Sequence, residues 1–317
     1  MQTIKPPRLN RGDVIGIVAP ASPPSSPEKI ERGAAYIETM GFRTVIGKHA
    51  RDADGYLAGS DDHRAEDLNA MFADPKIRAI FAARGGYGTP RILDRLDYES
   101  IRRNPKIFVG YSDCTALQCA IFTRTGLVTF SGPMVAVEMQ EKMDSFTEEN
   151  FWPLLCEPAP RRTLPRPPAP GLTLLRGGLG EGVLMGGNCT LLAALAGTPF
   201  MPAVDRTILF LEEIGEKPYR IDRLLAQLRL AGLLRRAAGV MLGTFSGCEA
   251  ASADGPSLSL DRIFSDYFSG VAGPVIGNFP YGHQPSKLTI PFGVSARVNT
   301  SAMTVELTEN TVAETFG

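Results

Sequence analysis

The 317-residue sequence is poor in the residue types that build metal centres and disulfide frameworks. Its three histidines, His49, His63 and His283, do not cluster along the chain, and its five cysteines have no metal-type spacing. We therefore predict no metal centre. An odd number of dispersed cysteines is typical of buried thiols in a reducing compartment.

The sequence also has no excess of one charge and no long apolar run. Its 33 basic and 34 acidic residues leave a net charge of −1, which gives no electrostatic reason to expect nucleic acid or an anionic membrane surface as a partner. No run approaches the ~20 apolar residues that span a bilayer, and the start MQTIKPPRLNRGD lacks the apolar core of a signal peptide. We expect a cytoplasmic protein that does not bind membranes.

A chain of this length exceeds the usual size of one hydrophobic core, so we predict two domains. In residues 1–150, short apolar runs alternate with amphipathic segments, which favours an α/β fold with a parallel sheet covered by helices on both faces. Ligands gather at the carboxyl ends of strands in such sheets, so residues 19–22, 84–88 and 110–113 should line one rim. The expected strands are residues 14–18, 42–46, 77–82, 107–109 and 127–130, and expected helices begin near residues 28, 60 and 115.

Proline content rises sharply after Trp152. Residues 156–171 (CEPAPRRTLPRPPAPG) contain six prolines, and we assign residues 151–171 to an extended linker. Residues 172–317 combine helical patterns with short β-rich runs that are separated by glycine, proline and asparagine turns. We predict that they form a second, β-rich domain of the α+β class.

The stretch KIFVGYSDCTALQC, residues 106–119, has the pattern of a buried strand that passes through a tight turn into a helix. Gly110 permits a sharp bend, and Asp113 can cap the helix that follows. Ser112 would then stand at the carboxyl end of a strand, beside the N–H groups of a helix N-terminus, where a nucleophile is favoured. The alternative is that Ser112 only caps the helix.

Two glycine-rich stretches, RGGYG at residues 84–88 and GGLGEG at residues 177–182, match neither the dinucleotide fingerprint nor the phosphate loop. Their spacing differs from both motifs, and the phosphate-loop lysine is missing. For Gly85 and Gly86 we favour a close backbone approach to a substrate, with an N–H group aimed at developing negative charge.

A serine nucleophile needs a base, and histidine is the usual choice because its ordinary pKa of ~6.5 lies near working pH. We interpret His49, in a polar loop, and His63, in an exposed first turn, as solvated side chains. His283, in the turn-rich segment NFPYGHQPSK, is better placed. The orienting carboxylate should follow a strand, and Glu212 or Glu213 in TILFLEEIGEKPYR meets that condition.

Five motifs occur in one order along the chain: RGGYG, VGYSDCTAL, MGGNCTLLAALAGTP, LFLEEIGEKPYRIDRLLAQL and GNFPYGHQPSKLTIPFG. In order and approximate spacing they resemble the LD-carboxypeptidase family of serine peptidases, which includes the microcin C immunity proteins. The resemblance covers about residues 12–293. It implies a Rossmann-like amino-terminal domain, a β-rich carboxy-terminal domain, and a homodimer with the active site between the domains.

The resemblance implies a triad of Ser112, Glu212 and His283, with no cofactor. Ser112 would attack the scissile carbonyl, His283 would take its proton, and Glu212 would orient the imidazole. Glu213 stands where the family commonly has aspartate, and this departure leaves open which of the two glutamates acts.

The resemblance also implies that backbone N–H groups hold the oxyanion, and the matching positions are Gly86 (or Gly85) and Asp113. A carboxypeptidase must bind a terminal carboxylate, and Arg does so best. The candidate cations, each of which could instead form a surface ion pair, are Arg84, Arg220 and Arg223.

The substrate implied by the resemblance is a small peptide, a cytoplasmic muropeptide, cleaved between the L-centre of a diamino acid and a terminal D-alanine. Two alternatives remain open. An immunity-type enzyme would cleave aminoacyl or peptidyl adenylate analogues and needs an aromatic residue to stack on adenine, a role for which Trp152 looks too much like a core residue. A non-catalytic protein that binds small molecules could also be built from the same two domains.

Overall fold

The computed structural model describes residues 2–166, 171–250 and 255–314. These residues divide into two compact units, and each is described by itself. The first unit contains residues 1–159, 288–293 and 310–317, and the second contains residues 160–287 and 294–309. The expected boundaries at 150 and 172 placed everything after residue 171 in one domain, whereas here two late segments return to the first unit.

The first unit is built on a six-stranded sheet with the order β12-β5-β4-β3-β1-β2. Strands β1 to β5 run parallel, and only the edge strand β12 runs antiparallel, against β5. The predicted parallel α/β sheet is therefore confirmed. The strands are β1 Val14–Val18, β2 Arg43–Ile46, β3 Ile77–Ala82, β4 Ile107–Val109, β5 Thr129–Ser131 and β12 Ile290–Phe292.

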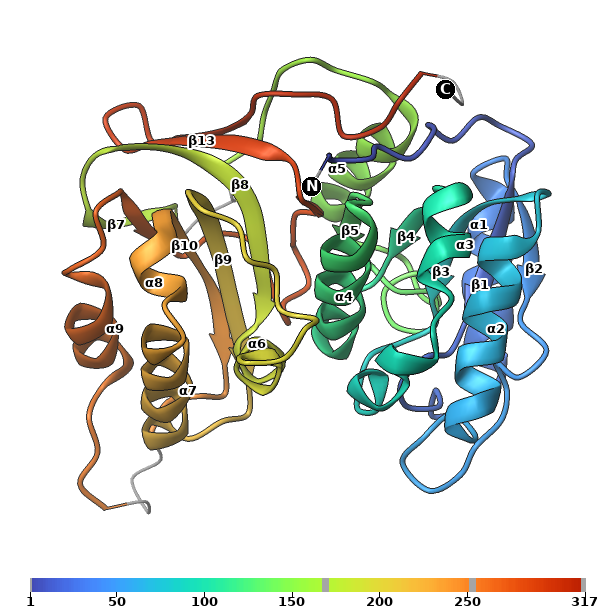
Figure 1. Cartoon of the computed structure of the whole chain (residues 1–317), viewed down its shortest axis with the longest axis horizontal. Helices are drawn as coiled ribbons and strands as arrows, with labels where there is room; N and C mark the ends of the chain where they lie inside the picture. The colour runs from blue at the N-terminus through green and yellow to red at the C-terminus, as the bar shows by residue number, and fades with distance from the viewer. Residues whose placement is uncertain (1, 167–170, 251–254, 315–317) are drawn as a thin grey trace. The chain divides into compact units, whose positions relative to one another are not determined.

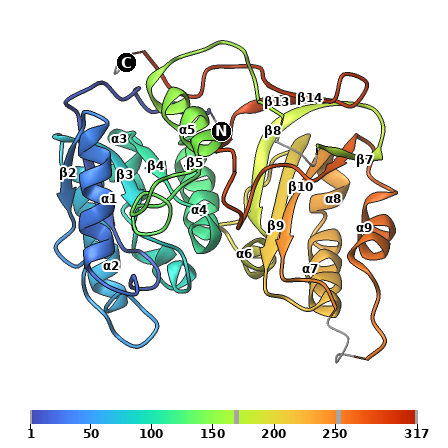
Figure 2. The same ribbon diagram turned by 180° about the vertical axis from the view of Figure 1, so that it is seen from behind.

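Helices cover both faces of this sheet. Figure 1 shows α2, α3 and α4 on the near face, and the reverse view in Figure 2 shows α1 and α5 on the other. Burial on both faces explains why β1 and β4 are apolar at every position and buried along their whole length. The helices are α1 Glu28–Thr39, α2 Asp61–Ala73, α3 Tyr98–Arg103, α4 Thr115–Thr125 and α5 Ser145–Cys156, and the 3-10 segments are η1 Thr89–Arg95 and η2 Ser112–Cys114.

Helix α5 corrects part of the predicted linker. Residues 151–156 form its last turns. Burial of Trp152 and Leu155 against the rest of the first unit stabilises these turns. The Trp152 ring stacks on Phe42 with centroids 5.0 Å apart, so the prediction that Trp152 belongs to the core is confirmed. Of the proline-rich stretch that follows, residues 167–170 lie outside the described residues.

The second unit is built on an eight-stranded mixed sheet with the order β6-β14-β13-β8-β9-β10-β11-β7. Its centre, β8 to β11, is parallel, and its flanking strands are antiparallel. The strand-rich second domain is thus as expected. The strands are β6 Arg162–Thr163, β7 Thr173–Arg176, β8 Leu179–Asn188, β9 Thr207–Ile214, β10 Ala237–Ser246, β11 Val275–Gly277, β13 Ser295–Asn299 and β14 Thr304–Leu307.

In the described part of the second unit four helices accompany the sheet, and α7 packs against the other three. Its apolar stripe of Ile221, Leu225 and Leu228 is buried, while its arginines lie on the exposed side. The helices are α6 Cys189–Leu195, α7 Pro218–Leu230, α8 Leu233–Arg236 and α9 Leu260–Phe268. Among the described residues, no helix combines the length and the apolar character needed to cross a membrane.

Candidate active site

The turn after β4 holds Ser112 in an unusual backbone conformation. The residue has φ +62°, a region that residues other than glycine seldom occupy. Ser112 opens the 3-10 segment η2, which runs directly into α4, and its side chain is half-buried. A strained serine between a strand and a helix matches the geometry of an elbow that presents a nucleophile.

The glycine-rich turn lies against this serine within the first unit. A Cβ on Gly85 would stand 3.2 Å from the Ser112 Oγ and 3.3 Å from the Asp113 backbone nitrogen. Gly86 has φ +111°, and a Cβ there would collide with Ser22 at 2.5 Å or less. Glycine is therefore required at position 86, and at position 85 a side chain would crowd Ser112. This close approach brings the segments 84–88 and 110–113 together as predicted.

Ser22, from the loop after β1, anchors the glycine turn. Its Oγ accepts a hydrogen bond from the Tyr87 backbone N–H at 3.0 Å, and its own N–H donates to the Gly85 carbonyl at 3.3 Å. The loop after β1 thus joins the other two segments, and the three predicted parts of the rim lie together.

Asp113 does not cap helix α4 as expected. The N-cap position belongs to Cys114, and the Asp113 carboxylate instead accepts a hydrogen bond from the Thr89 N–H at 2.8 Å. Thr89 Oγ1 donates to the Asp113 carbonyl at 2.6 Å. Asp113 is only 1% exposed, and burial raises the pKa of its carboxyl above the ordinary value. These two bonds fasten the glycine turn to the turn that carries Ser112.

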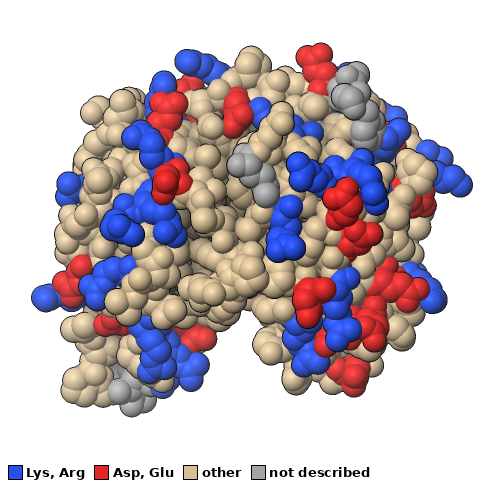
Figure 3. Space-filling view, in the orientation of Figure 1, with Lys and Arg blue, Asp and Glu red and all other residues tan. Residues whose placement is uncertain are grey.

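Arg64 is a positioning residue for this turn that the sequence did not reveal. Its guanidinium is fully buried, and its Nη1 donates to the carbonyls of Pro20 at 2.7 Å and Gly88 at 2.9 Å. Asp61 pairs with Arg64 and, at 2.9 Å, with Arg91. Figure 3 shows acidic and basic side chains mixed over α2 on the face drawn there, where these pairs hold η1 to the helix.

Glu212 and His283 meet inside the second unit. Glu212 lies near the end of β9 and is completely buried, and its Oε2 is 2.6 Å from Nδ1 of His283. The imidazole side chain is 18% exposed, so its other edge can reach solvent or a ligand. Glu212 Oε1 has no hydrogen-bond partner among the described residues, so the carboxylate is directed at the histidine alone. A buried carboxylate on Nδ1 fixes the imidazole tautomer with Nε2 as the proton acceptor.

Gly282 makes this pairing possible. With φ +112°, a Cβ would stand 2.9 Å from Glu212 Cβ and 3.1 Å from Glu212 Oε2. Ser246 in β10 donates to the His283 carbonyl at 2.9 Å, and the Thr244 N–H donates to the Tyr281 carbonyl at 2.9 Å. The segment that carries His283 is therefore held against β10, with no side chain between it and Glu212.

Glu213 points away from this pair. Its Oε1 accepts from Asn188 Nδ2 at 2.7 Å and its Oε2 accepts from the Thr190 N–H and Oγ1 at 2.8 Å. Burial raises the pKa of the Glu213 carboxyl. Of the two glutamates that the sequence left open, the structure places Glu212 on the histidine and Glu213 at the start of α6.

The three candidate cations have different surroundings. Arg84 is half-buried and donates to the Pro23 carbonyl at 3.1 Å, and no acidic side chain pairs with it among the residues that the structure describes. Arg220 is exposed and pairs with Glu216 at 3.2 Å. Arg223 is also exposed and lies over the Tyr219 ring at 5.5 Å.

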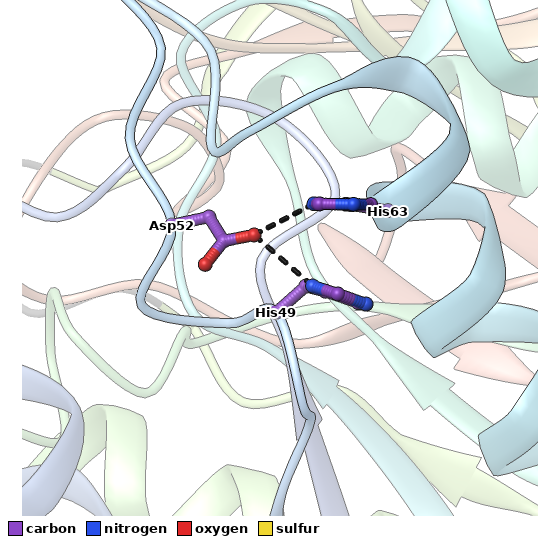
Figure 4. Close-up of side chains that lie close together, drawn as sticks. All are labelled: His49, Asp52 and His63. Carbon is purple, nitrogen blue, oxygen red and sulfur yellow. Dashed lines mark hydrogen bonds and ion pairs between the residues drawn. The ribbon is translucent and has the colours of Figure 1, made fainter.

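His49 and His63, which are separated in the sequence, lie together in the structure. Their rings stack with centroids 3.8 Å apart, and both Nδ1 atoms face Asp52 (Figure 4). Histidines that are dispersed along the chain thus meet in space, and the expectation that both are solvated is wrong for His49, which is buried, whereas His63 is exposed. The loop 47–59 folds back onto α2, and this brings His49 and Asp52 to the first turn of the helix.

The sequence matches known families over both units. Residues 15–132 match the description "LD-carboxypeptidase N-terminal domain", and residues 181–298 match "LD-carboxypeptidase C-terminal domain". The chain is 40% identical over 301 residues to the probable murein peptide carboxypeptidase of Bacillus subtilis (strain 168), and the alignment covers 95% of this chain and 93% of that protein.

Two solved structures are similar to this one over nearly all of the chain. The microcin C7 self-immunity protein MccF in complex with aspartyl sulfamoyl adenosine has a TM-score of 0.90 at 27% identity and covers 98% of this chain and 100% of its own. The muramoyltetrapeptide carboxypeptidase from Oxalobacter formigenes has a TM-score of 0.82 at 30% identity and covers 93% of this chain and 97% of its own. The similarity therefore extends over both units.

Proposed function

Because the chain belongs to the LD-carboxypeptidase family and is a serine-type peptidase, we propose that it releases the terminal D-alanine from murein tetrapeptide in the cytoplasm. The observation that carries the proposal is the buried Glu212 carboxylate 2.6 Å from His283 Nδ1. In this pair His283 can act as the general base, and the Glu212 carboxylate orients it and stabilises its protonated form. The first unit supplies Ser112, in a strained backbone conformation, beside backbone N–H groups. The name of the Bacillus subtilis relative supports a murein peptide as the substrate.

The proposed mechanism is acyl transfer through a covalent intermediate. Ser112 Oγ attacks the scissile carbonyl and transfers its proton to Nε2 of His283, while Glu212 stabilises the imidazolium through Nδ1. The N–H groups of Gly86 (or Gly85) and Asp113 bind the oxyanion. The imidazolium then protonates the leaving D-alanine amine, and a water molecule activated by His283 hydrolyses the acyl-enzyme.

We propose Arg84 as the residue that binds the terminal carboxylate of the substrate. It directly precedes the glycine turn, and among the described residues no carboxylate neutralises it. Arg220 is already paired with Glu216, and Arg223 lies over an aromatic ring. A bidentate guanidinium is the side chain best suited to a carboxylate.

The experiment is to incubate the protein with the free tetrapeptide and with the same peptide amidated at its terminal carboxylate, and to detect loss of one alanine by mass. We expect release of D-alanine from the acid, a much lower rate on the amide because the half-buried Arg84 guanidinium loses its charged partner, and no release by Ser112→Ala. Equal rates on the acid and the amide would contradict the exopeptidase assignment.

A second candidate function is hydrolysis of aminoacyl or peptidyl adenylate analogues, as the similarity to MccF with aspartyl sulfamoyl adenosine suggests. The observation that favours it is an exposed aromatic pair beside the glycine turn. Tyr56 and Tyr87 are 64% and 52% exposed, and their rings meet edge to face at 5.3 Å. Such rings can stack on a nucleobase. Faster cleavage of an aminoacyl sulfamoyl adenosine than of the tetrapeptide would establish this function instead.

The remaining proposals concern whether the protein is an enzyme or only a binding protein, its oligomeric state and its location in the cell. A protein that only binds small molecules would retain the muropeptide without cleaving it, so the same mass measurement separates binder from enzyme. We also propose a cytoplasmic homodimer, as the family resemblance implies. Light scattering of the purified protein measures its oligomeric state, and fractionation of cells measures its location.

A further inference from the structure

Outside the proposed catalytic machinery, two imidazoles and a carboxylate converge on one point (Figure 4). Oδ2 of Asp52 lies 3.0 Å from Nδ1 of His49 and 2.8 Å from Nδ1 of His63. One ligand atom from each of these residues lies within 4.8 Å of the others. His49 and Asp52 belong to the loop after β2, and His63 belongs to the first turn of α2.

His49 has a carboxylate oxygen at each of its two ring nitrogens. In addition to Asp52 at Nδ1, Oε2 of Glu66 lies 3.3 Å from its Nε2. A neutral imidazole has a single N–H, so it can donate to only one of these oxygens, and the other contact then brings two lone pairs together. A cation bound between one His49 nitrogen and the facing carboxylate would remove this contact between lone pairs.

The two rings lie on the same side of Asp52, with centroids 3.8 Å apart. The His49 side chain is 10% exposed, so it is held in place by the loop and α2. Lys48 supplies no charge at this point, because its ammonium contacts the other oxygen of Glu66 and is 71% exposed.

We propose that His49, His63 and Asp52 bind a divalent transition-metal ion, for which Zn²⁺ is the best match. Two imidazole nitrogens and one carboxylate oxygen are a common zinc ligand set, with water in the fourth position. Tetrahedral zinc with bonds of about 2.0–2.1 Å separates its ligand atoms by about 3.3 Å, close to the 3.0 Å and 2.8 Å that separate Asp52 Oδ2 from the two nitrogens. The rings, which stack at an interplanar angle of 18°, must turn so that both nitrogens face the ion.

Glu66 supports the site by contacting the His49 nitrogen that does not face Asp52. With Nδ1 of His49 on the metal, its Nε2–H donates to Glu66, and this carboxylate–histidine–metal arrangement is typical of zinc sites. The ion would join the loop 47–59 to α2. Gly59 fits this packing, since a Cβ there would lie 2.8 Å from Asp52 Cβ.

The test is calorimetric titration of ZnCl₂ into the full-length, untagged chain after dialysis against a chelator. We expect one equivalent of zinc bound with a Kd in the micromolar range or below, and a melting temperature that rises with zinc. His63→Ala and Asp52→Asn should each weaken binding at least about tenfold, and Glu66→Gln should weaken it about tenfold through His49. His63 and Asp52 are both partly exposed, so these variants are expected to fold.

The matched control is His283→Ala, because His283 is the only other histidine in the chain. It should leave the zinc affinity and the zinc-dependent rise in melting temperature unchanged. A Co²⁺ spectrum without an intense sulfur-to-metal band would exclude the cysteines as ligands. Absence of zinc binding, or affinity that is unchanged in both His63→Ala and Asp52→Asn, would overturn the proposal.

Discussion

Glu212 and Glu213 are chemically identical neighbours with different roles. Successive residues of a strand point to opposite faces of the sheet, so β9 directs one carboxylate toward His283 and the other toward the start of α6. Within the described parts of the chain the Glu212 side chain bonds to His283 alone, whereas Glu213 accepts bonds from Asn188, Thr190 and its own neighbour Ile214. The first arrangement suits catalysis, and the second suits stability.

Glu212→Gln should therefore affect kcat, and Glu213→Gln should affect stability. Glu212→Gln is expected to lower kcat by roughly 10³- to 10⁴-fold with little change in stability, because the amide no longer fixes the imidazole tautomer. Glu213→Gln is expected to keep kcat but to lower the free energy of unfolding by about 1–3 kcal/mol, because an NH₂ group would face backbone and hydroxyl donors. D-alanine release and calorimetry measure the two effects. A larger loss of kcat in Glu213→Gln would make Glu213 the orienting acid.

Gly282→Ala tests whether close approach to Glu212 is needed. The added methyl would meet Thr244 Oγ1 at 2.6 Å and Glu212 Cβ at 2.9 Å, and an error of about 1 Å in the position of His283 costs on the order of 100-fold in rate. The control is Gly215→Ala, which also has positive φ, at +72°, but has no atom within 4 Å of the added Cβ. That variant should show backbone strain of about 1–2 kcal/mol with unchanged kcat. Equal losses of rate in the two variants would show that strain, not collision, is the cause.

At the scale of elements, hydrogen bonds between turns define the first unit's part of the site. Thr89 fastens the start of η1 to Asp113, and Ser22 fastens the loop after β1 to the glycine turn. Each bond joins segments that follow different strands of the parallel sheet. The backbone donors beside Ser112 are thus positioned by neighbouring turns and not by α4 alone.

Lys106 links two elements and has a measurable pH signature. It is 3% exposed at the start of β4, and its ammonium donates to the Met71 and Asp74 carbonyls at the end of α2. Burial lowers the pKa of Lys106 from 10.5 to about 8. Between these values the unfolded chain binds more protons than the folded chain, so this residue makes the free energy of unfolding rise with pH.

Comparison with Lys106→Met isolates this contribution. Between pH 7.5 and 9.5 the free energy of unfolding of the natural protein should rise by about 2 kcal/mol more than that of the variant. Urea unfolding at the two pH values measures both proteins, and the background from other groups cancels in the difference. Parallel pH profiles for the two proteins would contradict the lowered pKa.

At the scale of the whole molecule, the chain leaves the first unit after residue 159 and returns to it twice. Residues 290–292 pair with β5 as the antiparallel strand β12, and Thr311 Oγ1 donates to the Leu154 carbonyl at 2.8 Å. The first unit therefore depends on residues far along the chain. Its sheet has an unpaired edge at β5 without them.

A fragment of residues 1–159 should consequently fold poorly by itself. We expect it to aggregate through the exposed edge of β5, and we expect a fusion that adds residues 288–293 through a Gly/Ser linker to be more monomeric and better ordered. Light scattering and the dispersion of amide NMR signals measure both properties. A monomeric fragment with native near-ultraviolet circular dichroism would show that β12 is dispensable.

Local patterns predicted most of the secondary structure but few of the roles. The strands at residues 14–18 and 77–82 appear where expected, because continuous apolar runs between turns leave little choice. Arg64 was missed because a charged residue in a helix is normally exposed. The signal was its position four residues before Leu68 and seven before Met71, which puts it on the buried stripe of α2.

By itself, the sequence determined the strand–helix alternation, the turn that holds Ser112, the glycine turn beside it and the family to which the chain belongs. The first three features depend on periodicity and on backbone preferences within a few residues, whereas the family was indicated by the order and spacing of five motifs. Only the tertiary structure decided that Glu212 and not Glu213 contacts His283, that β12 joins the first sheet, and that His49 meets His63. Each of these depends on contacts between segments distant in sequence, because packing and hydrogen-bond partners are selected by the whole fold and leave no local periodicity to detect.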